Sequence, residues 1–260
     1  MSHVFLIGAG PGDPELLTIK ALRRLASADV VLHDSLVDAR IIGMAPPAAR
    51  RIDVGKRCGR HSASQSEICS LLVAEALSGQ VVVRLKGGDP MMFGRATEEI
   101  DALRAHGISF EIIPGITAAT AAAATLELSL TKRGVARSVH FLTGHGAEGG
   151  LPAHDWVSLT KSGGTIVVYM GGQTLGGMAA HFIEAGMAPN MPAIAIENAS
   201  LGSQRTLRGT IASLPRLVES EAPTGPILIM IGEAMHETYD ASALDEISNK
   251  VAAASDLCFS

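Results

Sequence analysis

The chain has 260 residues, of which 47% are hydrophobic, and a formal net charge of −5. Apolar cores can form at this length, so the fold needs neither a disulfide framework nor a structural metal. The acidic balance disfavours nucleic acid as a partner, and no apolar run approaches the roughly 18–20 residues of a membrane span. Cys58, Cys69 and Cys258 form no C-x-x-C pair, which indicates a reducing compartment.

The start of the chain predicts a buried strand. Residues 1–7 have no basic flank, and Gly8 ends the apolar run. We therefore expect no signal peptide, and we expect a soluble cytoplasmic protein.

Short apolar runs alternate with helix-like segments, which is typical of β/α units on a mostly parallel sheet. In the first part of the chain we predict strands at Val4–Ile7, Val30–Leu32, Val81–Leu85 and Phe110–Ile113. Between the first two strands we expect a helix with Asp13 as N-cap and Pro14 as first residue. Its predicted apolar stripe is Leu22, Leu25 and Ala26.

A second set of elements follows Pro114-Gly115. An alanine-rich helix is expected at 118–126, and strands at Val139–Leu142, Ile166–Tyr169, Ala193–Ile196, Arg205–Arg208 and Ile227–Ile231. We therefore predict two α/β domains with mostly parallel sheets, over 1–114 and 117–237, and a tail over 238–260.

The opening turn, Gly8-Ala9-Gly10-Pro11-Gly12-Asp13, has two interpretations. A dinucleotide fingerprint needs a third glycine where Asp13 stands, and this carboxylate would face the diphosphate. Asp34 lies where an acidic ribose ligand would be expected, about twenty residues on, so that element alone does not exclude NAD. The other interpretation is a tight turn that Asp13 caps.

A second turn bears on this choice. The apolar strand that ends at Lys86 is followed by Gly87-Gly88-Asp89-Pro90, so both turns end in Gly-Asp-Pro. Because both follow strands at their carboxyl ends, we expect them to line one cleft. Glycines allow main-chain groups to approach a ligand, and an aspartate can balance a cation, which favours a sulfonium cofactor over a diphosphate.

Six motifs together resemble a known family: GAGPGDPELLT (8–18), VGKR (54–57), VRLKGGDP-x-x-FGR (83–95), PGITAA (114–119), TGH (143–145) and YMGG (169–172). From about residue 3 to 233 the chain resembles the tetrapyrrole methyltransferases. Two of these motifs, VRLKGGDP-x-x-FGR and VGKR, are similar to those of one group within this family, the uroporphyrinogen-III C-methyltransferases. The resemblance implies the tetrapyrrole methylase fold, with S-adenosyl-L-methionine (SAM) held in the cleft between the domains and S-adenosyl-L-homocysteine as product.

The resemblance also implies which residues hold SAM. In the first domain they are Pro11, Gly87, Gly88, Asp89 and Met92, and in the second Thr117, Ala118, Met170 and Ala199. The small residues among them permit close main-chain contact, and the thioether of Met170 can pack on an adenine face. Taken singly, a methionine beside a strand is more often part of the core.

The implied reaction is two successive methylations of uroporphyrinogen III, at C2 and C7, through precorrin-1 to precorrin-2, in cobalamin or sirohaem biosynthesis. By resemblance Asp34 is the proton acceptor and Lys56 the proton donor; Asp34 could otherwise be a turn cap, and Lys56 could anchor a propionate. For the substrate carboxylates we expect Arg84, Arg95 and Arg133, since guanidinium groups match carboxylates well. No metal is expected, and the resemblance implies a homodimer.

The sequence departs from the family pattern at Ser129–Arg133, where P-L-T-H-R is usual, and at Glu197–Ser200, where E-N-G-T is usual. These differences put the details of substrate specificity in doubt, more than the reaction itself. Three alternative functions stay open. The chain could be a related methyltransferase that acts later in corrin synthesis or on RNA, an NAD oxidoreductase, or a module that binds SAM without turnover.

Overall fold

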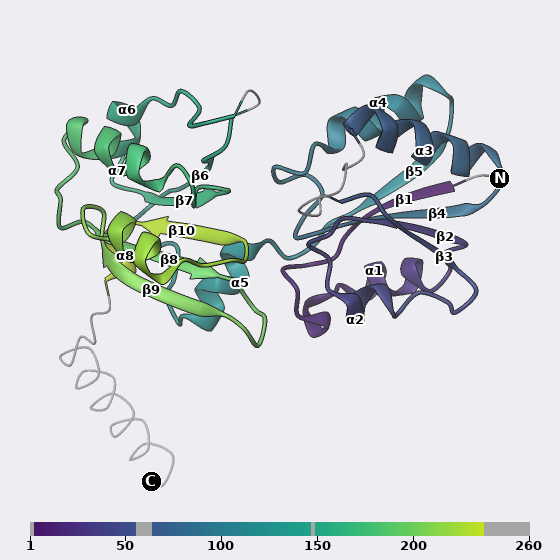
Figure 1. Ribbon diagram of the computed structural model, residues 1–260, viewed down its shortest axis with the longest axis horizontal. Helices are drawn as coiled ribbons and strands as arrows, with labels where there is room; N and C mark the ends of the chain where they lie inside the picture. Colours follow the sequence, from purple (N-terminus) through teal and green to yellow (C-terminus); the bar gives the residue numbers. More distant parts are fainter. Residues whose placement is uncertain (1–2, 56–63, 147–148, 237–260) are drawn as a thin grey trace, which may run out of the picture.

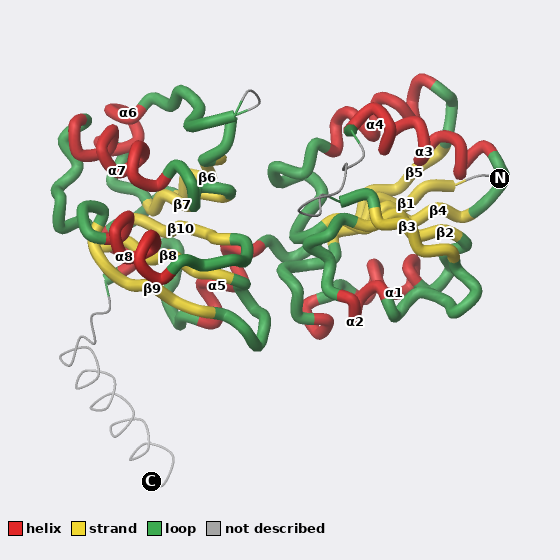
Figure 2. The backbone as a smooth tube through the Cα atoms, in the orientation of Figure 1, coloured by secondary structure: helices red, strands yellow, loops and turns green. Residues whose placement is uncertain are grey.

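The computed structural model describes residues 3–55, 64–146 and 149–236 (Figure 1). They form two five-stranded sheets with helices packed on them, and the chain passes from one sheet to the other once (Figure 2). The predicted α/β fold is confirmed. The sheets lie on either side of the boundary predicted at residues 114–117, although the division into domains stays a prediction. The tail predicted at 238–260 lies outside the described residues.

The first sheet has the order β3-β2-β4-β1-β5, and all its strand pairs are parallel. Its strands are β1 (His3–Gly8), β2 (Val30–His33), β3 (Arg50–Asp53), β4 (Val81–Lys86) and β5 (Ser109–Ile113). The helices α1 (Ile19–Leu25) and α2 (Ala39–Ile42) cover one face, and α3 (Gln65–Leu77) and α4 (Ala96–Ala105) cover the other (Figure 1).

The central strands of this sheet are largely apolar because both faces are covered. Val4 and Leu6 of β1 belong to the core beneath α3 and α4, whereas Phe5 and Ile7 belong to the core beneath α1 and α2. Side chains alternate between the two faces of a strand. By the same alternation, the even-numbered residues of β4 face α3 and α4.

The second sheet has the order β6-β7-β10-β8-β9. Its strands are β6 (Val139–Thr143), β7 (Thr165–Tyr169), β8 (Pro192–Glu197), β9 (Arg205–Thr210) and β10 (Ile227–Ile231). The helices α7 (Leu175–Glu184) and α8 (Leu214–Glu221) contribute to the core on one face, with α6 (Trp156–Lys161) beside them. Helix α5 (Ala118–Thr125) and the 3₁₀ turn η2 (Glu233–Met235) pack on the other.

The two sheets differ in strand direction. In the second, only β6 and β7 are parallel, and β10 and β9 run antiparallel to their neighbours. Parallel pairs predominate over the whole molecule, as predicted, but the second sheet by itself is mixed. The short connections from β8 to β9 and from α8 to β10 allow antiparallel neighbours, which apolar runs alone do not reveal.

Three local predictions need correction. Asp13 caps the 3₁₀ turn η1 (Pro14–Leu16), and Thr18 caps α1. On α1, Leu25 is buried as expected, but Leu22 and Ala26 are exposed. The polar edge strand β3 was not predicted, because an edge strand of this composition shows no apolar run. Among the described residues, no helix has the length and apolarity that a bilayer crossing needs.

Candidate active site

The two glycine turns lie side by side at the carboxyl ends of β1 and β4. The Gly10 amide donates to the Gly88 carbonyl at 3.1 Å, and the Gly88 amide donates to the Gly10 carbonyl at 2.7 Å. The sequence predicted that both turns line one cleft, and in the structure they meet because β1 and β4 are neighbouring parallel strands. The two turns therefore form one main-chain surface.

The segment that leads to the second sheet packs directly onto these turns. A Cβ atom on Gly115 would lie 2.2 Å from the Gly88 carbonyl oxygen and 2.8 Å from Gly8 Cα. The Asp89 carboxylate accepts hydrogen bonds from the Gly115 amide at 2.9 Å and the Met91 amide at 2.8 Å. Only glycine allows this approach of main chains, and Asp89 fastens the second turn to the connecting segment.

The exposed side of the second turn is open toward α5. Gly88 has a φ of +66°, and a Cβ atom there would meet only Thr117 Cα, at 4.0 Å. Thr117, the N-cap of α5, shares a hydrogen bond between its hydroxyl and that of Tyr169. Burial raises the pKa of Tyr169, and the charge of Asp89 acts in the same direction. The second turn and the start of α5 therefore lie next to each other, and no side-chain atom comes within 4 Å of a Cβ at Gly88.

The loops of the second sheet reach the first turn. The Asp13 amide donates to Ser200 Oγ at 3.3 Å, and the ring centroids of Phe93 and Tyr169 lie 5.2 Å apart. Ala199 is buried beside Ser200. These contacts place the predicted cofactor residues of both halves around one region.

Met170 occupies a strained position next to this region. It has a φ of +56° and is 51% exposed, which is unusual for a methionine. It lines a cavity of about 830 Å³ together with Gly172, Gln173 and Thr224. An exposed apolar side chain held in a costly conformation is typical of a ligand site.

A buried group of charges lies beneath Asp34. The Arg84 guanidinium donates through Nη2 to Asp34 Oδ1 at 2.5 Å and through Nε to Glu99 Oε1 at 3.1 Å. Lys86 Nζ donates to the same Glu99 oxygen at 2.8 Å. The Arg84 side chain is 2% exposed and that of Asp34 is 30% exposed. Asp34 is therefore the member of this group that reaches the surface.

The arginines predicted for substrate carboxylates lie in different surroundings. Arg95 and Arg133 are exposed, and Arg95 pairs with Glu98 at 2.8 Å. Arg84 is turned inward and held by two carboxylates, so its guanidinium is not presented to a ligand at the surface. Pro11, Gly87, Met92 and Ala118 are partly exposed near the turns and the start of α5. Lys56 lies outside the described residues.

Three side chains of this region were not predicted: Glu99, Tyr169 and Glu197. Glu99 follows Ala96 by three residues and precedes Leu103 by four, so it falls on the buried stripe of α4. A carboxylate on an apolar stripe was the signal available in the sequence. Within the described residues, no cluster of three or more His, Cys, Asp or Glu side chains is placed to hold a metal ion.

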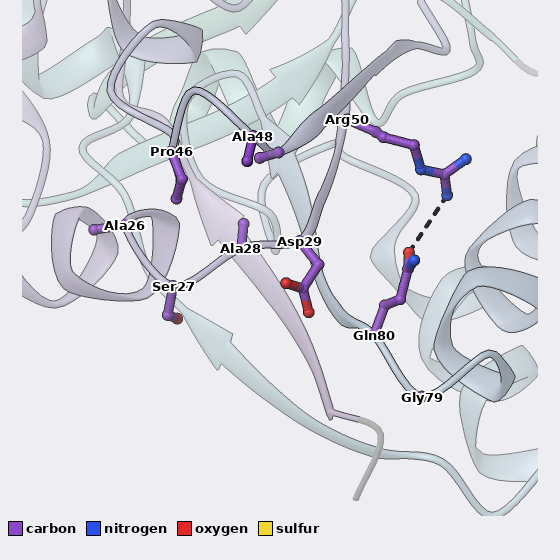
Figure 3. Close-up of a pocket in the computed structure, with 10 residues that line it drawn as sticks. Ala26, Ser27, Ala28, Asp29, Pro46, Ala48, Arg50, Gly79 and Gln80 are labelled. Atoms are coloured by element: carbon purple, nitrogen blue, oxygen red, sulfur yellow. Dashed lines mark hydrogen bonds between the residues drawn. The ribbon is translucent and has the colours of Figure 1, made fainter.

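A separate cavity lies at the opposite, amino-terminal end of the first sheet (Figure 3). Residues before β2, β3 and β4 line it, and Arg50 donates to Gln80 at 3.4 Å across its rim (Figure 3). Ligands of open α/β sheets bind at the carboxyl ends of the strands. This cavity is therefore distinct from the candidate active site.

The opening turn also decides between its two interpretations. Asp13 Oδ1 accepts the hydrogen bond of the Glu15 amide at 3.0 Å. A carboxylate thus takes the main-chain donor that a diphosphate would need at this place. The geometry disfavours a dinucleotide site.

Comparison with known proteins shows the family of this chain. A model of the tetrapyrrole (corrin/porphyrin) methylases matches residues 3–215, and the chain belongs to this family. It is 43% identical over 237 residues to the S-adenosyl-L-methionine-dependent uroporphyrinogen III methyltransferase of Methanosarcina barkeri, covering 90% of this chain and 92% of that protein.

The chain is also similar to a second curated protein and to a solved structure. The siroheme synthase of Chromobacterium violaceum is 47% identical over 232 residues, which cover 89% of this chain and 49% of that protein. The chain thus spans about half the length of that relative. The crystal structure of uroporphyrin-III C-methyl transferase from Thermus thermophilus complexed with S-adenyl homocysteine has a TM-score of 0.76 and 37% identity, covering 90% of this chain and 93% of that chain.

Proposed function

We propose that this chain is a SAM-dependent C-methyltransferase that converts uroporphyrinogen III to precorrin-2 by two methylations, at C2 and C7, through precorrin-1. The observation that carries the proposal is the main-chain surface of the two joined glycine turns, which faces Thr117. The names of the relatives from Methanosarcina and Thermus support the same substrate. The product would serve sirohaem or cobalamin biosynthesis.

The residues around the turns fit SAM. Gly88 carries no side chain that would keep a ligand from its main chain, and Thr117 and Ala118 begin the neighbouring helix α5. Met170 offers an exposed thioether to an adenine ring. We assign the cofactor to these residues together with Pro11, Gly87, Asp89, Met92 and Ala199.

When bound, SAM supplies a methyl group already activated by a sulfonium. The methyl carbon forms a bond to a pyrrole carbon as its bond to sulfur breaks, and S-adenosyl-L-homocysteine leaves. The methylated ring then loses a proton, and the Asp34 carboxylate, partly exposed and oriented by Arg84, accepts it. We retain Lys56 as proton donor on the resemblance alone.

The substrate is a polycarboxylate, whereas the chain has a net charge of −5. Binding therefore requires a local concentration of cations. We assign this role to Arg95 and Arg133, which are exposed. Because Arg84 is buried against Asp34 and Glu99, we revise its role from substrate binding to orientation of Asp34.

The test is a methylation assay on the purified protein with uroporphyrinogen III and SAM, followed by mass and absorbance. We expect the tetrapyrrole to gain the mass of two methyl groups, with two equivalents of S-adenosyl-L-homocysteine released. A folded protein that binds S-adenosyl-L-homocysteine and transfers no methyl group would contradict the proposal. We also propose a cytoplasmic homodimer, and light scattering in solution tests the dimer.

A further inference from the structure

Glu99 is the most deeply buried carboxylate near the candidate active site. Its side chain is 0% exposed, and α4 places it against β4. The even-numbered residues of β4 point toward α4, so Arg84 and Lys86 both approach it. A single oxygen, Oε1, accepts from Arg84 at 3.1 Å, from Lys86 at 2.8 Å and from Gln65 at 3.3 Å.

The other oxygen of Glu99 has no hydrogen-bond partner although it is buried. A buried polar atom without a partner is costly, so this arrangement is not the one that stability alone would favour. The carboxylate is instead oriented so that Oε1 accepts hydrogen bonds from both Arg84 and Lys86. In this geometry, Arg84 and Lys86 both bind Glu99, and Arg84 also binds Asp34.

The charges of this group balance only when all members are present. Arg84 and Lys86 are two buried cations, and Asp34 and Glu99 are their two carboxylates. Burial lowers the pKa of Lys86, and the neighbouring charge of Arg84 lowers it further, whereas Glu99 opposes both effects. Without Glu99, the full attraction of both cations would act on Asp34.

The other polar groups packed on this cluster carry little compensating charge. Gln65 and Cys69 approach from α3, and burial raises the pKa of the Cys69 thiol. His33 of β2 has its Nδ1 at 3.3 Å from the Asp34 carbonyl oxygen, and Glu98 pairs outward with Arg95. Glu99 is therefore the group that offsets the second cation.

We propose that Glu99 is a positioning residue for methyl transfer: by neutralising Lys86 and holding Arg84 from behind, it sets the orientation and basicity of Asp34. The inference rests on the proposed function, in which Asp34 accepts the proton. Glu99 itself does not touch the substrate.

The test compares Glu99→Gln with Lys86→Met, which change the charge of the cluster in opposite directions. In Glu99→Gln we expect kcat to fall about tenfold or more, since base catalysis is worth about 10²–10⁴-fold. Asp34 then faces two cations alone, so the acid limb of the kcat profile moves to lower pH by about one unit. In Lys86→Met the limb moves to higher pH, and the double variant returns it toward the wild-type position.

A second readout needs no substrate. The ¹³C NMR signal of the Asp34 carboxyl carbon, titrated in the free protein, is expected to shift its midpoint in the same directions. The matched control is Glu75→Gln, which removes the partner of Arg50 on the outer part of α3. Affinity for S-adenosyl-L-homocysteine should stay within about twofold in all variants, because the cluster lies behind the glycine turns.

Each outcome decides the matter. The inference is overturned if Glu99→Gln behaves as Glu75→Gln does. It is also overturned if Glu99→Gln and Lys86→Met move the acid limb of the kcat profile in the same direction. In both cases, methylation by the wild type still supports the proposed function. If Glu99→Gln does not fold, Lys86→Met decides: an unmoved limb and an unmoved NMR midpoint overturn the inference. A wild-type protein that transfers no methyl group refutes the proposed function, and this inference with it.

Discussion

Asp34 combines two properties that a proton acceptor needs. It reaches solvent at the carboxyl edge of the first sheet, and a buried guanidinium fixes one of its oxygens. Charge-assisted hydrogen bonds of this kind hold a side chain more firmly than a surface contact does. The Asp34 side chain as a whole remains 30% exposed.

At the residue scale we predict the effect of Asp34→Ala. We expect kcat to fall by about 10²- to 10⁴-fold, because the proton acceptor is lost, with S-adenosyl-L-homocysteine affinity unchanged. Single-turnover methylation and calorimetry measure the two quantities. The control is Asp38→Ala, which removes the N-cap of α2 and should cost about 1 kcal/mol of stability without slowing turnover. Loss of cofactor binding in Asp34→Ala would show that its role is misassigned.

At the scale of elements, the candidate site depends on turns rather than on helices or strands. The first and second turns bond to one another, and the connecting segment is clamped to them by Asp89. On the other sheet, Glu197 at the end of β8 accepts from the Thr224 and Gly225 amides before β10. Carboxylates at strand ends thus hold the loops on both halves.

Gly88→Val tests the second turn. The residue has a φ of +66°, where a β-branched side chain costs about 1–2 kcal/mol, and the added methyl groups would extend toward Thr117. We expect a folded protein whose affinity for S-adenosyl-L-homocysteine falls about 100-fold or more, measured by calorimetry.

Gly107→Val is the matched control for this variant. Gly107 has a φ of +64° with nothing within 4 Å of an added Cβ, and it lies beyond the end of α4. Its backbone cost should be similar, with no loss of affinity. Equal affinity in the two variants would contradict the assignment of the turn to the cofactor.

Glu197→Gln tests the loop before β10 through its pH dependence. Hydrogen bonds from the Gly225 and Thr224 amides, together with Arg205, hold the pKa of Glu197 below its usual 4.5. A carboxyl whose pKa falls on folding stabilises the protein above that usual value, and the contribution is lost as pH falls through the folded-state pKa.

We therefore expect the variant to melt several degrees below the wild type at about pH 7, and the gap to narrow below about pH 4. Thermal unfolding at a series of pH values measures it. Glu184→Gln, at an exposed side chain, should show no such gap. If the difference in melting temperature between Glu197→Gln and the wild type does not change with pH, the lowered pKa of Glu197 is not the cause of the stabilisation.

At the scale of the whole molecule, a protein of net charge −5 has to bind a polyanion. Attraction must therefore come from local cations, and salt screens such attraction. The two halves meet through the first turn and the loop after β8, where Asp13 contacts Ser200. This contact holds the first turn against the loop after β8.

We predict that KM for uroporphyrinogen III rises about tenfold between about 50 and about 500 mM salt, whereas KM for SAM changes little. Arg95→Met and Arg133→Met should raise KM at low salt and weaken its salt dependence. Arg104→Met is the control, because this exposed arginine lies near the end of α4 and pairs with Asp101. Steady-state methylation kinetics measure KM, and a KM independent of salt would refute the proposed cationic surface.

The sequence alone predicts eight apolar strands, one polar strand near Arg205–Arg208 and both glycine turns. Each of these depends on local pattern: a run of buried residues, or a glycine where the main chain must bend or be approached. The sequence also predicted that both turns line one cleft, because each follows the carboxyl end of a strand.

Only the tertiary structure decided the edge strand β3, the antiparallel pairs of the second sheet and the partners of Arg84. Edge strands form where a neighbouring strand leaves its hydrogen-bonding groups free, and strand direction depends on how distant segments pack. The sequence suggested Arg84 for a substrate carboxylate and gave no sign that Asp34 and Glu99 pair with it. Their pairing is a contact through space between β2, β4 and α4, and no local pattern encodes it.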